Sequence, residues 1–323
     1  MATIKTVLIT GANAGLGKEA ARQLALDPSI TKIYLGARNE QRAREAKRSL
    51  EDATGRSIFE LLIFDLNDLE SARAAAEVLP EPVDAVLLNA GGAGGPNAMS
   101  TTADGVLELF AFNVLGHVAL TEALLHKGKV SSTVLFAGTE ATRGVPYMRI
   151  PAPDLRSSSE QEFASIVNGS WFDGLDAMAA YGVVKYVGTM WMSAMARRHP
   201  QLRFVTVSPG ATRGTNGPDQ LPAALRFLYK YVAFPMLTAF GRAHGIDVGA
   251  RRYLEVLADP STYKSGGFYA SAGNTTSGPL VEQTPLFEDL GNEAFQDNAY
   301  AAVQRFVGTT PVRDGAREAA RRG

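Results

Sequence analysis

The sequence contains no cysteine, which excludes disulfide bonds, thiolate nucleophiles, iron–sulfur clusters and cysteine-ligated zinc. Any redox chemistry must therefore come from a bound cofactor. The chain has only four histidines, and no two of them lie three or four residues apart, so local spacing offers no helical pair of metal ligands. We expect no metal site.

The sequence also lacks an excess of charge of either sign. It has 32 lysines and arginines and 33 aspartates and glutamates, which gives a net charge of −1. This balance provides no bulk attraction for nucleic acid or an anionic membrane, and we expect neither as a partner. The N-terminus lacks a signal-peptide core, and no apolar run approaches the ~18 residues of a transmembrane helix. The sequence therefore predicts a cytoplasmic protein.

Short apolar runs alternate with longer amphipathic stretches, which is the pattern of a doubly wound α/β fold, a parallel sheet with helices on both faces. No repeat or linker divides the 323 residues, so we predict one domain over 1–308 and a polar tail at 309–323. About seven strands are expected, at Thr6–Thr10, Lys32–Gly36, Ile58–Phe64, Ala85–Leu88, Thr133–Ala137, Arg203–Ser208 and Gly267–Ala270. Helices are expected near 15–26, 40–53, 68–78, 103–126, 181–198, 220–240, 246–258 and 286–307.

A glycine-rich turn follows the first predicted strand and opens the first predicted helix. Gly11, Gly15 and Gly17 permit a tight turn and a close approach of the backbone, and the helix N-terminus offers free N–H groups to a pyrophosphate. Because strand, turn and helix occur in the required order, we interpret this turn as a dinucleotide site.

Five further motifs follow in order along residues 4–215: Asp65-Leu66 and Asn89-Ala90-Gly91 after the third and fourth strands, Asn113 in a helix, Tyr181 four residues before Lys185, and Pro209-Gly210 after the sixth strand. Together with the run from Thr10 to Gly17, they resemble the landmarks of the short-chain dehydrogenase/reductase family. The resemblance implies a Rossmann-like fold, a nicotinamide cofactor and hydride transfer. It also implies a homodimer or homotetramer, with a monomer as the alternative seen in relatives with a long lid. The implied cofactor contacts are Gly11, Asn13, Ala14, Gly15, Leu16, Gly17, Arg38, Asp65, Leu66, Asn89, Ala90, Gly91, Tyr181, Lys185, Pro209, Gly210 and Thr212.

The end of the second strand bears on the choice of cofactor. An acidic residue there would accept a hydrogen bond from a ribose 2′-hydroxyl, whereas a basic residue would pair with a 2′-phosphate. Ala37 occupies the position where NAD-preferring relatives often place aspartate, and Arg38 follows it, with Arg42 one helical turn later. We therefore expect NADP(H).

Tyr181 and Lys185 lie on one face of a helix, where a nearby ammonium would bring the pKa of the phenol toward the working range. In the family the lysine also holds the nicotinamide ribose and the tyrosine donates the proton. Thr139 stands where relatives usually place a serine that holds the substrate oxygen, and Asn113 corresponds to an asparagine that supports the proton relay. We interpret the next residue, Glu140, as a polar loop residue rather than a substrate contact, and His117 as a packed or backbone-bonded histidine.

Two segments follow strand ends and are candidate substrate walls, 140–180 and 211–248. The first brings aromatic residues to the mouth of the site, which suits a bulky apolar or aromatic substrate. The apolar stretch 221–237 is a lid, a subunit contact or an interfacial membrane helix; its two basic residues weaken the membrane alternative. These features look most like the protochlorophyllide reductase and retinol dehydrogenase branch, although the cysteine of the protochlorophyllide reductase pocket is missing.

The resulting hypothesis is an NADPH-dependent reductase of a small-molecule ketone or aldehyde, with Tyr181 as proton donor. Lys185 lowers the pKa of Tyr181 and anchors the ribose, Thr139 orients the carbonyl oxygen, and Asn113 supports the proton relay. One alternative is reduction of a carbon–carbon double bond in a conjugated ring with the same cofactor. The other is a regulatory protein that binds NADP(H) without turnover, which only the threonine at the usual serine position favours.

Overall fold

The computed structural model describes residues 4–95, 97–174, 177–213, 241–273 and 275–308. Their main feature is an eight-stranded sheet in the order β10-β9-β6-β5-β4-β1-β2-β3. The seven strands other than β10 all run parallel to one another in the sheet. Only β10, at one edge, is antiparallel to its neighbour, β9. The strands are β1 (Thr6–Thr10), β2 (Lys32–Ala37), β3 (Phe59–Ile63), β4 (Val83–Leu88), β5 (Val130–Ala137), β6 (Arg203–Val207), β9 (Phe268–Ser271) and β10 (Leu280–Glu282).

This topology confirms the predicted doubly wound fold and all seven predicted strands. The eighth, β10, is an addition to the expected count, since its three half-buried residues at the sheet edge are too short to show an alternating pattern.

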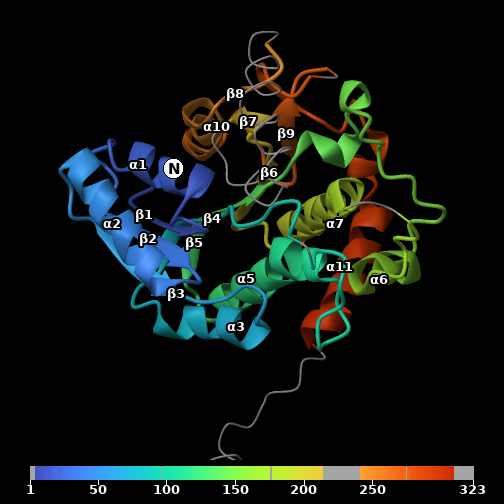
Figure 1. Ribbon diagram of the computed structural model, residues 1–323, viewed down its shortest axis with the longest axis horizontal. Coiled ribbons are helices and arrows are strands. Elements are labelled where there is room, and N and C mark those ends of the chain that lie inside the picture. The colour runs from blue at the N-terminus through green and yellow to red at the C-terminus, as the bar shows by residue number, and fades with distance from the viewer. Residues whose placement is uncertain (1–3, 96, 175–176, 214–240, 274, 309–323) are drawn as a thin grey trace, which may run out of the picture.

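Helices cover both faces of the sheet, so alternate side chains of one strand enter different cores (Figure 1). Val7 and Ile9 pack with residues of α1, α2 and α10, whereas Leu8 between them packs with residues of α3, α5, α7 and α11. This is why the inner strands are apolar throughout. The helices are α1 (Gly15–Leu24), α2 (Glu40–Thr54), α3 (Leu69–Val78), α5 (Gly116–His126), α7 (Ala177–Arg198), α10 (Ile246–Ala258) and α11 (Glu293–Gly308).

The sequence expectation that no apolar run approaches the length of a membrane span needs one correction. The helical segment Glu108–His126 has 19 residues and a mean hydropathy of 1.3, which is enough by length and composition alone. However, 72% of it is buried inside the protein, against the sheet and α3. We therefore interpret it as a core helix, whose polar residues Asn113 and His117 are also buried.

The predicted insertion 140–180 contains short helices that the sequence pattern did not predict. They are the 3-10 helices η2 (Glu140–Arg143) and η3 (Pro146–Met148) and the α-helix α6 (Glu160–Asn168), which packs against α7 and α11. The start of α6 is held by the carboxylate of Glu162, which accepts bonds of 2.8 Å from the backbone N–H groups of Arg156, Ser157 and Ser158.

Glu162→Gln should lower the free energy of unfolding by about 1–2 kcal/mol at pH 7, because it removes the charge from these hydrogen bonds. Burial opposes ionisation of Glu162, but the hydrogen bonds from Arg156, Ser157 and Trp171 outweigh it and lower the pKa from 4.5 to about 2. A depressed folded-state pKa stabilises the protein above the unfolded-state value, and this contribution is lost as the pH falls from 4.5 toward 2.

Urea denaturation of the wild type and the variant at several pH values measures this effect. Glu160→Gln is the control, since Glu160 forms a surface ion pair with Arg305 and should matter less. A difference between wild type and Glu162→Gln that stays constant down to the lowest pH would contradict the assignment.

The segment 211–248 begins and ends in a short parallel pair, β7 (Thr212–Arg213) with β8 (His244–Gly245). The backbone N–H of His244 also donates to the carbonyl of Ala211 at 3.0 Å. The predicted helix near 220–240, the apolar stretch 221–237 and the tail 309–323 lie outside the described residues. The division into one domain over 1–308 stays a prediction.

Candidate active site

The turn between β1 and α1 has the geometry of an anion site. Gly11 and Gly15 have φ values of +66° and +56°, which favour glycine. A Cβ on Gly17 would lie 2.6 Å from the carbonyl oxygen of Gly11, so α1 can approach the turn this closely only with glycine there. The N-cap residue of α1 is Ala14, whose side chain cannot accept a hydrogen bond. The first N–H groups of α1 therefore remain available to a phosphate.

The predicted motif after β4 is bonded to the end of β1. Asn89 donates from its side-chain amide to the carbonyl oxygen of Thr10, and the N–H of Ala90 donates to the Thr10 hydroxyl, each at 2.9 Å. The glycine turn and the Asn89-Ala90-Gly91 segment thus lie side by side at the carboxyl edge of the sheet, where doubly wound folds bind nucleotides.

His117 extends this connection into the core. Its Nδ1 contacts the carbonyl oxygen of Asn113 at 3.1 Å, and its Nε2 contacts the Thr10 hydroxyl at 2.9 Å. Burial and the charge of Lys185 lower the pKa of His117 to about 3, so the ring is neutral at physiological pH. Since a carbonyl only accepts, Nδ1 carries the proton and Nε2 accepts from Thr10. His117 is backbone-bonded, as expected.

Asn113 lies in a π-helical turn, Ala111–Leu115, that widens the helix between α4 (Glu108–Phe110) and α5. Its amide donates to the carbonyl oxygens of Gly92 at 2.9 Å and Leu109 at 2.8 Å, and its oxygen accepts from the Gly92 N–H at 2.9 Å. The side chain is therefore satisfied by the loop after β4 and holds that loop in place.

Lys185 is brought next to this loop by α7. A Cβ on Gly91 would lie 2.5 Å from the Asn113 oxygen and 3.2 Å from the Lys185 ammonium nitrogen, so the three residues meet at one point. The ammonium donates to the carbonyl oxygen of Ala137 at 2.9 Å and lies 5.9 Å from the centre of the Tyr181 ring. Lys185 is 1% exposed, whereas Tyr181 is only partly buried.

The ionisation of this pair differs from the sequence expectation. Burial, with a contribution from Glu140, raises the pKa of Tyr181 above its usual range instead of lowering it. Burial also lowers the pKa of Lys185 to about 7, so its ammonium form is only partly populated near neutral pH and favours the phenolate less than expected. Tyr181 is therefore protonated near neutral pH, as an unperturbed tyrosine would be, and it is a weaker acid than the sequence led us to expect.

Thr139 follows β5 and faces the same region. Its hydroxyl accepts from the N–H of Ala141 at 3.3 Å at the start of η2. A Cβ on Gly182 would lie 2.8 Å from the carbonyl oxygen of Ala141, and this close approach of α7 brings the neighbouring Tyr181 beside the segment that starts at Thr139.

The interpretation of Glu140 as a polar loop residue is wrong. Its side chain is 3% exposed and forms an ion pair with Arg252 of α10, with 3.5 Å between the charged atoms. The sequence offered no signal for this pairing, because a charged residue in an amphipathic helix such as α10 is normally solvated.

The region expected to hold the adenosine end of the cofactor contains one basic and one acidic side chain, Arg38 and Asp65. Arg38 is exposed at the end of β2, and its guanidinium lies 3.7 Å from the carboxylate of Asp65. Ala37 is buried and small, and α2 begins at Glu40 with Asn39 as its cap. Leu66 is 8% exposed and belongs to the hydrophobic core, and its carbonyl group packs closely against Gly116.

The motif after β6 is packed against α10 and β8. Gly210 has a φ of +77°, and a Cβ there would lie 2.7 Å from the Arg252 guanidinium. The hydroxyl of Thr212 donates to the carbonyl oxygens of Gly210 at 3.0 Å and Pro209 at 3.3 Å. Every predicted cofactor contact thus lies at or near the carboxyl ends of β1, β2, β3, β4 and β6, or on α7.

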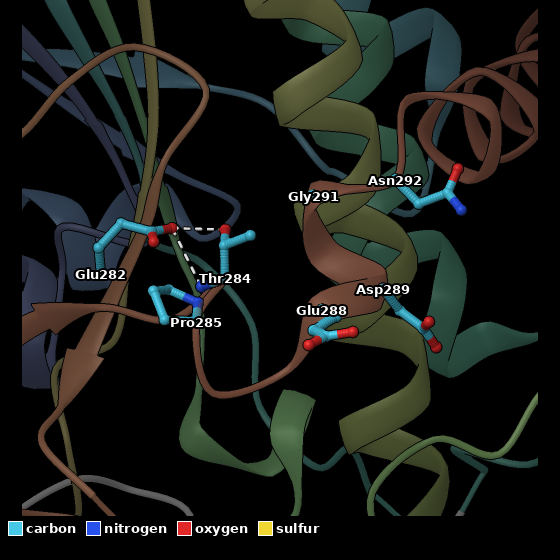
Figure 2. Close-up of a pocket in the computed structure, with 7 residues that line it drawn as sticks. All are labelled: Glu282, Thr284, Pro285, Glu288, Asp289, Gly291 and Asn292. Atoms are coloured by element: carbon cyan, nitrogen blue, oxygen red, sulfur yellow. Dashed lines mark hydrogen bonds between the residues drawn. The ribbon is translucent and has the colours of Figure 1, made fainter.

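A separate surface depression of about 520 Å³ lies beside β10 and the 3-10 helix η6 (Glu288–Gly291) (Figure 2). It contains the carboxylates of Glu282, Glu288 and Asp289, and Glu282 accepts bonds from the backbone and hydroxyl of Thr284 (Figure 2). None of the predicted site residues lines it. Within the described part of the chain, no group of three histidine or acidic residues is arranged to hold a metal ion.

Known proteins resemble this chain in sequence and in fold. The family model described as short chain dehydrogenase matches residues 5–151. The NADP-dependent 3-hydroxy acid dehydrogenase of Schizosaccharomyces pombe is 33% identical over 150 residues, 43% of this chain and 57% of that protein. Retinol dehydrogenase 11 of Mus musculus is 39% identical over 131 residues, 40% of each chain. The solved structure of salutaridine reductase from Papaver somniferum has a TM-score of 0.59 at 18% identity, covering 82% of this chain and 99% of that one.

The chain spans 38% to 61% of the length of the first curated relatives that it matches. The range matched by the family model includes the glycine turn and the Asn89-Ala90-Gly91 segment, and the structural match extends over 82% of this chain. Residues 5–151 are thus similar in sequence to the short-chain dehydrogenase/reductase family, and the described residues share the fold of a solved reductase structure.

Proposed function

We propose that the protein is an oxidoreductase that uses NADPH to reduce the carbonyl group of a bulky apolar or aromatic ketone or aldehyde. The observation that carries the proposal is the meeting of Gly91, Asn113 and Lys185 next to Tyr181, beside an uncapped helix N-terminus that suits a pyrophosphate. When bound, the cofactor supplies the hydride. The relative named as an NADP-dependent dehydrogenase and the retinol dehydrogenase support this class of reaction.

The residues of the chain have distinct tasks in this proposal. Tyr181, which is protonated near neutral pH, gives its proton to the carbonyl oxygen. Lys185 is held by the carbonyl oxygen of Ala137 and holds the ribose of the cofactor. Thr139 orients the carbonyl oxygen of the substrate with its hydroxyl, and Asn113 fixes the loop against which the nicotinamide lies.

The test is oxidation of NADPH and NADH by the purified protein with aromatic, aliphatic and polycyclic ketones and aldehydes. We expect turnover with NADPH and an alcohol as the product. An enone in the panel distinguishes carbonyl from double-bond reduction, because the alcohol and the saturated ketone are different molecules. Tight binding of NADPH without turnover of any carbonyl would overturn the proposal.

Arg38→Gln should raise the KM for NADPH about tenfold and leave the KM for NADH nearly unchanged. The guanidinium at the end of β2 is exposed and close to the start of α2, so it can pair with a 2′-phosphate that only NADPH carries. Steady-state kinetics with both cofactors measure the change. Arg44→Gln is the control, since Arg44 is an exposed arginine of the same helix that pairs with Glu40. Equal changes for both cofactors would contradict this role.

A further inference from the structure

The charged pair of Glu140 and Arg252 is buried directly behind the candidate site. Each side chain is 3% exposed, and Glu140 is the residue after Thr139. Burying two charges is expensive unless their remaining hydrogen bonds are satisfied. None of the family motifs includes this pair.

Both charged groups form hydrogen bonds to the core around them. The hydroxyl of Ser208 donates to Glu140 Oε2 at 2.5 Å, and Ser271 donates to Oε1 from its hydroxyl at 2.7 Å and its N–H at 3.2 Å. The guanidinium of Arg252 donates to the carbonyl oxygens of Ser208 at 3.2 Å and Gly278 at 2.7 Å. One network therefore connects the ends of β5, β6 and β9 with α10.

Four other titratable groups interact electrostatically with Glu140. Arg143 donates to Gln283 and to backbone carbonyl groups and not to Glu140, so it contributes only its charge. His244 contributes no charge near neutral pH, because burial lowers its pKa. Tyr253 and Tyr181 are the remaining two, and burial raises the pKa of both. Glu140 is thus the one anion among these groups.

We propose that Glu140 is a positioning residue of the active site, which holds Thr139 against the turn after β6 and places a fixed negative charge beside Tyr181. The proposal rests on the proposed function in one respect, the role of Tyr181 as proton donor. Its structural basis is independent of that role, because the ion pair and the five hydrogen bonds named above lie in the described residues whatever the reaction.

The expected consequence has a definite sign. Glu140 lies in the 3-10 helix that α7 approaches at Gly182, next to Tyr181, and a negative charge near a phenol disfavours the phenolate, so Glu140 contributes to the raised pKa of Tyr181. Replacing Glu140 by glutamine removes the charge at nearly constant shape. The midpoint of Tyr181 ionisation should then fall by roughly one pH unit, as for a charge interacting through a protein interior.

The experiment titrates Tyr181 directly. 3,5-Difluorotyrosine is incorporated at position 181 of the full chain, and its ¹⁹F chemical shift is followed against pH in the wild type, Glu140→Gln and Arg252→Gln. Fluorination lowers the pKa of the phenol into an accessible range, and no substrate is needed. The reading therefore does not depend on whether a carbonyl is ever turned over.

We expect the midpoint to fall in Glu140→Gln and not in Arg252→Gln, because removal of the cation cannot favour the phenolate. Both variants leave one buried charge unpaired, so thermal denaturation should show a similar loss of stability in both. Glu122→Gln, on α5, is the control and should leave the midpoint unchanged. A fall in both variants would indicate general loosening and overturn the proposal, as would an unchanged midpoint in Glu140→Gln.

Discussion

Tyr181→Phe is expected to abolish carbonyl turnover, with a loss of about 10³-fold in kcat, while NADPH still binds. The phenol is the group proposed to supply the proton, and general acid catalysis contributes typically 10²–10⁴-fold. Phenylalanine keeps the ring beside Lys185, whose ammonium lies 5.9 Å from its centre, so the surrounding structure should persist. Turnover under saturating substrate and binding of NADPH by fluorescence measure the two effects separately.

Tyr186→Phe provides a matched control on the same helix. Tyr186 is 1% exposed and packs against Phe163, and its hydroxyl has no hydrogen-bond partner among the described residues. Removing that hydroxyl should therefore leave turnover near the wild-type value. If Tyr181→Phe retained wild-type turnover, Tyr181 would not be the proton donor and the proposed mechanism would fail.

Gly91→Ala should reduce kcat about 10²-fold, because the new methyl group would enter the point where the catalytic residues meet. Its Cβ would lie 2.5 Å from the Asn113 oxygen and 3.2 Å from the Lys185 nitrogen, so both side chains must move. Displacement of reacting groups by about 1 Å can lower a rate by about 10²-fold. The adjacent Gly92 has almost the same backbone angle, with φ values of +152° and +150°, but a Cβ there would meet nothing within 4 Å.

Comparison of Gly91→Ala with Gly92→Ala separates the effect of backbone strain from the effect of displacing Asn113 and Lys185. Both should lose about 1–3 kcal/mol of stability to backbone strain, and Gly91→Ala should lose more, because its Cβ also displaces buried side chains. Only Gly91→Ala should lose turnover beyond what its stability explains. Thermal denaturation and steady-state kinetics on the folded fraction provide the comparison, and equal turnover in the two variants would rule out the proposed meeting point.

Most of the sheet could be predicted from the sequence because its inner strands are buried on both faces. Val7, Leu8 and Ile9 are all 0% exposed, and such continuous apolar runs leave a clear local signal. The short elements left none: β10 has three residues, and α6 is stabilised by the loop that Glu162 binds before the helix starts. Those contacts follow from the folded shape and not from a periodic pattern.

The candidate active site, like the fold, could be predicted from the sequence only in part. The motif residues Gly91, Asn113 and Lys185 were expected to act together, and the structure brings them together because α7 and the π-helical turn both approach the loop after β4. The direction of the pKa of Tyr181 could not be predicted, since it depends on burial and on Glu140. The partner of Glu140, Arg252, comes from a helix formed much later in the chain.

The short parallel pair of β7 and β8 has a consequence for how this protein could diversify. Because the chain leaves the core at Arg213 and returns at His244 through neighbouring strands, the distance between these two anchor points is independent of what connects them. The entropy of closing such a connection grows only slowly with its length. The connecting segment can therefore be exchanged for a longer or shorter one at little cost in closure entropy, and under the proposed function such an exchange would alter which carbonyl compounds are accepted while the sheet stays the same.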